Sequence, residues 1–317
     1  MSTVKEKFIL SRIYGAIYEI YNPQFGNVHA VLKGRLRLGR SEERHPFVVG
    51  DRILAEPGTG EEWVILEKEE RKNFLTRKSV FADTHVLCSN VDNLLIIASL
   101  ESPVTKDSFI DRCLAAAFFG KIHPLIVFNK TDLAKNALIE DKQEKYNHLG
   151  YEVYTVSCLE EGSIEVLKNR IAGQTTFFAG NSGVGKSSLL NLISGIKIQS
   201  IGNVSISTQK GRHTTTNTRA IFLEENTILI DSPGIKEWGL LHLQVHEALE
   251  TFPEFWSLKE ECQSVDCCNG SKRCEILKNR EDIEISPERK KSLEAILQSI
   301  QKPGKHKTSV YTRKTRR

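Results

Sequence analysis

The chain has 317 residues, with 44 Lys and Arg against 40 Asp and Glu, a net charge of +4 and 39% hydrophobic residues. This length suits two or three domains, and the composition is that of a globular protein and not of a disordered one. No apolar run approaches the roughly 18 residues of a membrane span, and the N-terminus lacks the layout of a signal peptide. We therefore expect a cytoplasmic protein with no membrane partner.

Residues 1–70 are expected to form a small β-barrel domain. Three β-rich stretches, with a hairpin signal at residues 57–60, are separated by turns: residues 13–20, 28–32 and 63–66. In residues 33–38, which follow the second of these stretches, strand alternation places Lys33, Arg35 and Arg37 on one face. A small barrel with a cationic face suits an OB-fold that binds RNA, although a solvated strand face would have the same pattern.

Residues 71–240 are predicted to form an α/β domain. Residues 71–78 have the character of a linker, and beyond them apolar strands alternate with helices, which is the signature of a mainly parallel sheet. The expected helices are residues 107–119, 134–149 and 164–171, and the expected strands include residues 124–128, 152–156, 175–179 and 227–230.

The tetrad Asn129-Lys130-Thr131-Asp132 directly follows the predicted strand 124–128, at the end where open α/β sheets bind ligands. Asp132 can accept hydrogen bonds from the ring N–H and the exocyclic amine of guanine, whereas adenine has no matching donors. An unpaired buried polar group costs about 1–3 kcal/mol, so an aspartate here selects GTP over ATP. Ser157 and Cys158 follow the strand 152–156, where a backbone N–H would meet the guanine carbonyl.

A glycine-rich loop between the strand 175–179 and the apolar helical run 188–193 has the pattern of a phosphate-binding loop. Its glycines allow successive backbone N–H groups to face a phosphate, Lys186 adds a positive charge, and Ser187 places a hydroxyl on Mg²⁺. The residues expected to hold GTP here are Gly180, Asn181, Ser182, Gly183, Val184, Gly185, Lys186, Ser187 and Ser188.

Two further motifs are expected to surround the γ-phosphate and its Mg²⁺ ion. Asp231 ends the strand 227–230 and would reach the metal through water, and Gly234 would offer its backbone N–H to the γ-phosphate. One threonine of residues 214–216 would complete the Mg²⁺ shell, and Thr215 is the one we favour.

The position after Gly234 is Ile235, where the familiar small GTPases have a glutamine that orients water. Isoleucine cannot orient or polarise water, so unaided hydrolysis should be slow and another group must complete the site. His213 is the candidate for this catalytic role, and the alternative is a histidine that bonds only within its own loop.

The tetrad precedes the phosphate loop, which is the reverse of the order in an ordinary G domain and predicts a circularly permuted GTPase. The chain resembles the bacterial ribosome small-subunit-dependent GTPase A family. The resemblance is carried by residues 49–51, 90–97, 111–112, 211–216 and 231–239. It implies an α/β fold: a circularly permuted P-loop G domain with an N-terminal OB-fold β-barrel and a C-terminal helical zinc-binding-type domain.

Seven cysteines without a secretion signal favour a reducing compartment and metal ligation over disulfides. We expect isolated Cys88, Cys113 and Cys158 to be packing residues. Residues 241–301 are expected to form the C-terminal domain, and they contain the cluster Cys262, Cys267, Cys268 and Cys274. The family pattern has a histidine where this chain has Asn269, so the expected zinc ion would take Cys268 or Asn269 as its fourth ligand. The alternative is four thiols without a metal.

Residues 302–317 contain seven Lys or Arg residues and no acid, as in cationic arms that bind phosphate backbones, although a merely solubilising tail has the same composition. The resemblance implies a GTP hydrolase, with GTP and Mg²⁺, that acts in late maturation of the small ribosomal subunit. We expect a monomer that binds the subunit and its rRNA and is stimulated by it. The alternative is a nucleotide-gated RNA-binding module whose hydrolysis is incidental.

Overall fold

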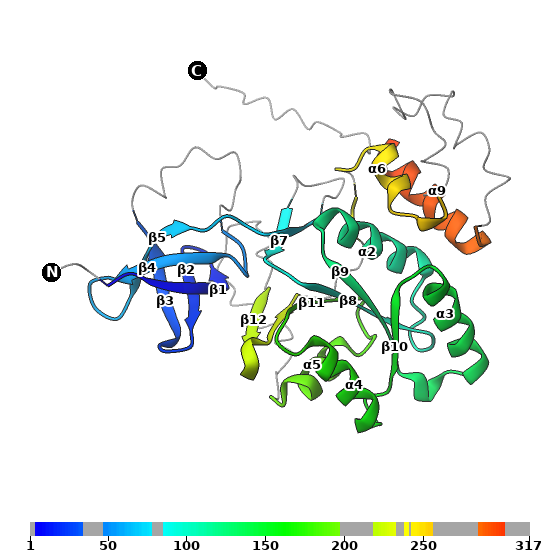
Figure 1. The fold of residues 1–317 in the computed structure, drawn as a ribbon, viewed down its shortest axis with the longest axis horizontal. Coiled ribbons are helices and arrows are strands. Elements are labelled where there is room, and N and C mark those ends of the chain that lie inside the picture. Colours follow the sequence, from blue (N-terminus) through cyan, green and yellow to red (C-terminus); the bar gives the residue numbers. More distant parts are fainter. Residues whose placement is uncertain are drawn as a thin grey trace, which may run out of the picture.

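The computed structural model describes residues 4–33, 47–77, 85–196, 218–232, 238–240, 242–255 and 285–301 (Figure 1). One 11-stranded sheet runs through the protein in the order β10-β9-β8-β11-β13-β12-β1-β2-β3-β5-β4, and β6 and β7 form a separate two-stranded sheet. No helix within the described ranges is long and apolar enough to cross a membrane.

The first five strands form a closed barrel, because β1 pairs with β2 on one side and with β4 on the other. Their bounds are β1 Glu6–Tyr14, β2 Ile17–Asn22, β3 Gly26–Leu32, β4 Arg52–Pro57 and β5 Trp63–Lys68. The predicted barrel is confirmed and is consistent with an OB-fold. The expected stretch 13–20 is divided between β1 and β2, because Gly15 turns the chain with a φ of +61°. Inward-facing Leu10, Ile20 and Ile65 are fully buried in the barrel.

The remaining part of the large sheet is mainly parallel, as the alternation of strands and helices predicts. Four neighbouring pairings, β10–β9, β9–β8, β8–β11 and β11–β13, are parallel, and β12 is antiparallel to β13. The bounds are β8 Asn93–Ser99, β9 His123–Asn129, β10 Glu152–Val156, β11 Thr175–Gly180, β12 Arg219–Phe222 and β13 Ile228–Asp231.

Two layers of helices cover this sheet, and strand alternation decides which residues face each layer. Ile96, Phe128 and Phe177 point to the layer of α2 (Asp107–Gly120) and α3 (Asn136–His148). Leu95, Val127 and Phe178, each a sequence neighbour of one of these, point to α4 (Glu161–Ile171) and α5 (Lys186–Ser194). The carboxyl ends of the strands therefore lie between two packed layers.

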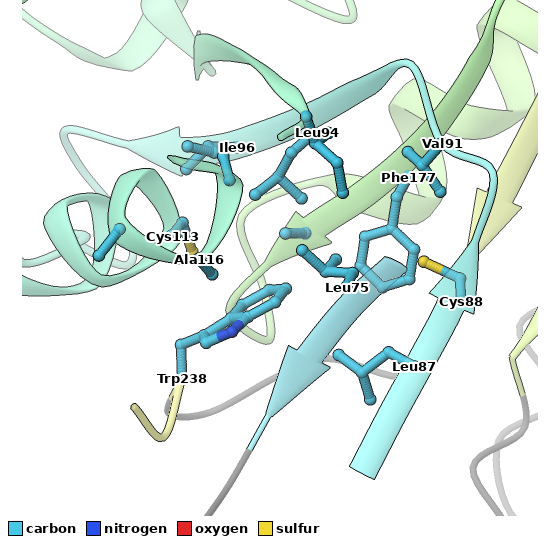
Figure 2. Packing of buried hydrophobic residues seen from close by; sticks show 14 of the residues in the cluster. Leu75, Leu87, Cys88, Val91, Leu94, Ile96, Cys113, Ala116, Phe177 and Trp238 are labelled. Carbon is cyan, nitrogen blue, oxygen red and sulfur yellow. The ribbon is translucent and has the colours of Figure 1, made fainter. Parts of the chain in front are cut away.

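Residues 71–78, predicted as a linker, contain a strand. β6 (Phe74–Arg77) pairs with β7 (His85–Ser89) and packs against the sheet and α2. Figure 2 shows Leu75 and Leu87 of this hairpin beside Phe177 and Trp238. The rings of Phe177 and Trp238 pack edge to face with their centres 6.3 Å apart. Trp238 Nε1 donates a hydrogen bond to the carbonyl of Thr76 at 3.1 Å.

The isolated cysteines divide into two kinds. Cys88 and Cys113 are fully buried packing residues, as expected, and both lie in the core of Figure 2. Burial raises the pKa of both thiols. Cys158 is only partly buried, and its Sγ lies 3.7 Å from Asn129 Oδ1 at the end of β9. It therefore belongs to the surroundings of the tetrad.

A buried carboxylate joins the barrel to the β6–β7 hairpin. Asp51 accepts hydrogen bonds from Val48 N at 2.8 Å and Ser89 Oγ at 2.6 Å, and Arg71 contributes two more, at 2.7 and 2.9 Å. The neighbouring Gly50 has a φ of +93°, and a Cβ there would lie 2.2 Å from the carbonyl oxygen of Ser89. Only glycine allows this close approach of the two backbones.

The C-terminal helices α6 (Val245–Glu250) and α9 (Pro287–Gln301) pack beside α2 (Figure 1). An ion group fixes α9 in this position. Arg289 is 2% exposed, and its Nη1 lies 2.6 Å from Asp111 Oδ1 of α2. Its Nη2 donates to Glu254 Oε2 at 2.9 Å.

Candidate nucleotide-binding site

Four of the predicted site segments begin where a parallel strand ends. Asn129 ends β9, Ser157 follows β10, Gly180 ends β11 and Asp231 ends β13. Asn129 lies directly opposite Ser99 of β8 and Val156 of β10 in the parallel pairings, so the carboxyl ends of these strands lie at one edge of the sheet. This is the edge at which open α/β sheets bind ligands.

Asn129 connects the tetrad to the phosphate loop. Its side chain is 1% exposed, and Nδ2 donates to the carbonyl of Val184 at 2.9 Å. Lys130 has a φ of +63°, and its Nζ donates to the carbonyl of Ser102 at 2.7 Å. The tetrad is therefore anchored both to the phosphate loop and to the loop that follows β8.

Asp132 and Ser157 form the pair that would read a base. Ser157 is fully buried, and its Oγ donates to Asp132 Oδ1 at 2.6 Å. The same Oγ accepts from Leu159 N at 3.2 Å. Asp132 itself is exposed, so its carboxylate is oriented from behind by a buried hydroxyl and faces solvent. An oriented acceptor of this kind suits two adjacent N–H donors on the edge of a planar ligand.

The phosphate loop turns through two glycines with positive φ angles, +87° at Gly183 and +89° at Gly185. A Cβ on Gly185 would lie 2.2 Å from Asn129 Nδ2, so the contact with the tetrad also requires glycine. α5 begins at Lys186, directly after the loop, and has nine residues. Its first backbone N–H groups, together with the helix dipole, form an anion-binding end.

Asn181, in the same loop, has a buried Oδ1 for which the structure shows no hydrogen-bond partner. An unpaired buried polar atom is costly, and this one lies in the segment that would surround a phosphate. Ser187 and Ser188 are exposed in the first turn of α5. The glycine turn and the exposed hydroxyls fit a nucleotide phosphate, and the amide oxygen, which accepts hydrogen bonds and cannot pair with a phosphate oxygen, fits a hydrated Mg²⁺ ion.

Two cations hold the carboxylate of Asp231. Lys186 Nζ contacts Oδ1, and Arg219 Nη2 lies 3.5 Å from Oδ2. Lys186 is 9% exposed and Asp231 is 17% exposed at its side chain, so this pairing is largely shielded from solvent. The amine of Lys186 therefore lies at the carboxyl ends of β11 and β13, beside the phosphate loop.

Several predicted residues lie outside the described residues: His213, Thr215, Gly234, Cys262, Cys267, Cys268, Asn269, Cys274 and the tail 302–317. In the part of the chain that the structure does describe, no group of three His, Cys, Asp or Glu residues is placed to hold a metal ion.

Two further parts of the site, Arg219 and the loop after β8, carry no motif in the sequence. In that loop Pro103 lies close enough to Gly183 that a Cβ on the glycine would be 3.3 Å from the proline ring. The rule that ligands bind at the carboxyl ends of strands, which supports the tetrad, applies equally to β8 and points to this loop. Arg219 has no such local signal.

The sheet, the phosphate loop and the permuted order of the motifs define a circularly permuted GTPase. A crystal structure of YjeQ from Thermotoga maritima has a similar fold, with a TM-score of 0.70 and 24% identity over 94% of this chain and 99% of that one. The circularly permuted GTPase YloQ is similar as well, with a TM-score of 0.68 and 20% identity over 96% of this chain and 97% of its own.

The family model described as RsgA GTPase matches residues 68–241. A relative from Flavobacterium johnsoniae is 30% identical over 94% of each chain, and one from Borrelia recurrentis is 37% identical over 79% of this chain and 80% of its own. Both are named small ribosomal subunit biogenesis GTPase RsgA. The chain belongs to the RsgA GTPase family and is a GTPase, for which the family implies GTP and Mg²⁺. An ABC transporter model also matches residues 169–314, a range that contains the phosphate loop.

Proposed function

We propose that this GTPase acts in late maturation of the small ribosomal subunit, binding the subunit and its rRNA as a monomer and hydrolysing GTP faster when bound. The observation that carries the proposal is the site itself, in which Asn129 joins the base-reading pair Asp132 and Ser157 to the phosphate loop. The names of relatives that cover almost the whole chain support the ribosomal role.

In this proposal the tetrad and the residues after β10 bind guanine, and the phosphate loop with Lys186 binds the phosphates. The guanine side comprises Asn129, Lys130, Thr131, Asp132, Ser157 and Cys158, and the phosphate side comprises residues 180–188 with Gly234. Ser187, Thr215 and Asp231 would hold Mg²⁺, which neutralises phosphate charge when bound. His213 would help to complete the hydrolytic site that lacks a glutamine.

We further propose the following division of the chain: an OB-fold domain at residues 1–70, the GTPase domain at 71–240, a C-terminal helical domain at 241–301 and a basic tail at 302–317. The closed barrel supports an RNA-binding OB-fold, because that fold presents one sheet face to single-stranded nucleic acid. The packing of β6 against α2 supports assigning the hairpin to the GTPase domain.

The small ribosomal subunit should stimulate GTP hydrolysis by this protein. The purified protein should hydrolyse GTP slowly, and purified small subunits should accelerate multiple turnover by about 10²-fold or more, because a partner completes a site that lacks its glutamine. His213→Ala should lose most of the stimulated rate and retain its affinity for GTP. Phosphate release measured with and without subunits checks both statements.

His246→Ala is the matched control for this experiment, since His246 lies on α6 outside the site. Stimulation that survives His213→Ala intact would assign His213 to its loop alone. An absence of stimulation in the wild type would favour the alternative function, in which hydrolysis is incidental to RNA binding.

The cysteine cluster should bind one zinc ion. The donor set of Cys262, Cys267, Cys268 and Cys274 is chemically suited to Zn²⁺, because soft thiolates are preferred ligands of this ion. Metal analysis of protein purified without a histidine tag should find one Zn²⁺ per chain. Cys268→Ser should reduce the bound zinc more than Asn269→Ala does, and a stoichiometry near zero under reducing conditions would refute the site.

A further inference from the structure

Arg219 lies between the barrel and the nucleotide site. It is the first residue of β12, and its register partners are Arg12 on barrel strand β1 and Asp231 at the end of β13. Both pairings are antiparallel, so the side chains of directly opposed residues lie on the same face. A row of three charged residues, Arg12, Arg219 and Asp231, therefore crosses from the barrel to the proposed Mg²⁺ site.

The two arginines of this row turn to different partners. Like charges directly opposite each other repel, and the guanidinium of Arg12 lies over the ring of Tyr14, 4.7 Å from its centre. Arg219 extends the other way, with Nη2 3.5 Å from Asp231 Oδ2. The position of Arg12 on the barrel therefore favours the contact between Arg219 and Asp231.

The barrel is attached to β12 at both ends of that short strand. Arg12 pairs with Arg219 at its beginning. At its end, the rings of Tyr21 and Phe222 stack with their centres 3.7 Å apart and their planes at 14°. Figure 1 shows β12 in the region between the barrel and the parallel strands. A displacement of the barrel against the GTPase domain would therefore act directly on Arg219.

We propose that Arg219 is a positioning residue that opposes Mg²⁺ at Asp231 and links the attachment of the barrel to the magnesium affinity of the nucleotide site. This role of Arg219 rests on the proposed function, in which Asp231 is the carboxylate that holds Mg²⁺. A cation in contact with this carboxylate lowers its attraction for a second cation. Coupling between two sites is reciprocal, so a partner that loosens the β1–β12 seam would strengthen Mg²⁺ binding, and bound Mg²⁺ would loosen the seam.

The test measures dissociation of fluorescent mant-GDP from the full chain as a function of Mg²⁺ concentration. Arg219→Gln should lower the Mg²⁺ concentration for half-maximal slowing of release by about three- to ten-fold, the effect of removing one nearby charge at the edge of the protein. Arg219→Lys should recover most of the wild-type value, because it keeps the charge. Arg12→Gln should shift the value in the same direction as Arg219→Gln but by less.

Arg170→Gln is the matched control, because the Arg170 side chain is about as exposed as that of Arg219, 28% against 23%, and it pairs with Glu152 at the amino end of β10. It should leave the Mg²⁺ dependence unchanged. A higher or unchanged Mg²⁺ requirement in Arg219→Gln, in protein whose circular dichroism shows it folded, overturns the proposal. A shift in Arg219→Gln without one in Arg12→Gln overturns the link to the barrel.

Asp231→Asn separates this proposal from the proposed function on which it rests. If Asp231 serves Mg²⁺, this variant should lose most of the Mg²⁺ effect on mant-GDP release. Loss in Asp231→Asn with no shift in Arg219→Gln refutes the role of Arg219 alone. An unaltered Mg²⁺ dependence in Asp231→Asn refutes the assignment of Asp231 itself.

Discussion

Asp132→Asn is expected to change the base preference of the site from guanine to xanthine. The carboxylate would accept two N–H donors of guanine, each worth about 1.5–3 kcal/mol as a charge-assisted hydrogen bond, so the GTP affinity should fall by about two to four orders of magnitude. Xanthine carries a carbonyl in place of the exocyclic amine, and the new amide can donate to it. Competition of GTP, ATP and XTP against a fluorescent nucleotide measures the change.

Asp141→Asn is the control for this substitution, because it removes the same charge from an exposed position on α3. It should leave all three affinities unchanged. Ser157→Ala should weaken GTP binding by a smaller factor. The substitution removes the hydroxyl that orients Asp132 at 2.6 Å but keeps the carboxylate that would contact guanine. A GTP preference that persists in Asp132→Asn would show that the base is read elsewhere.

Arg289→Leu is expected to destabilise the protein by about 3–5 kcal/mol, the cost of removing one partner from a buried ion group. The substitution leaves the carboxylates of Asp111 and Glu254, on α2 and beside α6, buried without their cation. Urea unfolding followed by circular dichroism measures the free energy of unfolding. Lys290→Leu, at the neighbouring exposed position on α9, should change it by less than about 0.5 kcal/mol.

The loss in Arg289→Leu should depend on pH. Burial raises the pKa of Asp111 to about 6, and Arg289 acts in the opposite direction. Without the arginine the pKa of Asp111 in the folded protein rises further. A carboxyl with a raised folded-state pKa contributes its full stability below the pKa it has in the unfolded chain, and this contribution is lost as pH rises through the folded-state pKa. The variant should therefore lose more stability relative to wild type at pH 8 than at pH 5. An equal loss at both values would show that Asp111 does not carry the effect.

The features that depend on neighbouring residues could be predicted from the amino-acid sequence. Hydrophobic periodicity and turn chemistry are local properties. They predicted the strand 152–156 with its observed bounds, and the helix 107–119 to within one residue. The motifs place Asn129 and Asp231 after predicted strands, and for the tetrad this is the end at which open α/β sheets bind ligands.

The features that join distant parts of the chain became visible in the folded protein alone. The strand β6 was expected as a linker, because four residues carry a weak local signal and become a strand only by pairing with β7 and packing on α2. Arg289 meets Asp111 across a separation of 178 residues. Arg219 is a lone cation in its stretch of sequence, and only the closing of the barrel places Arg12 on one side of it and Asp231 on the other. Such long-range pairings leave no periodicity in the sequence, because the free energy that forms them comes from packing between elements and not from the residues of one element.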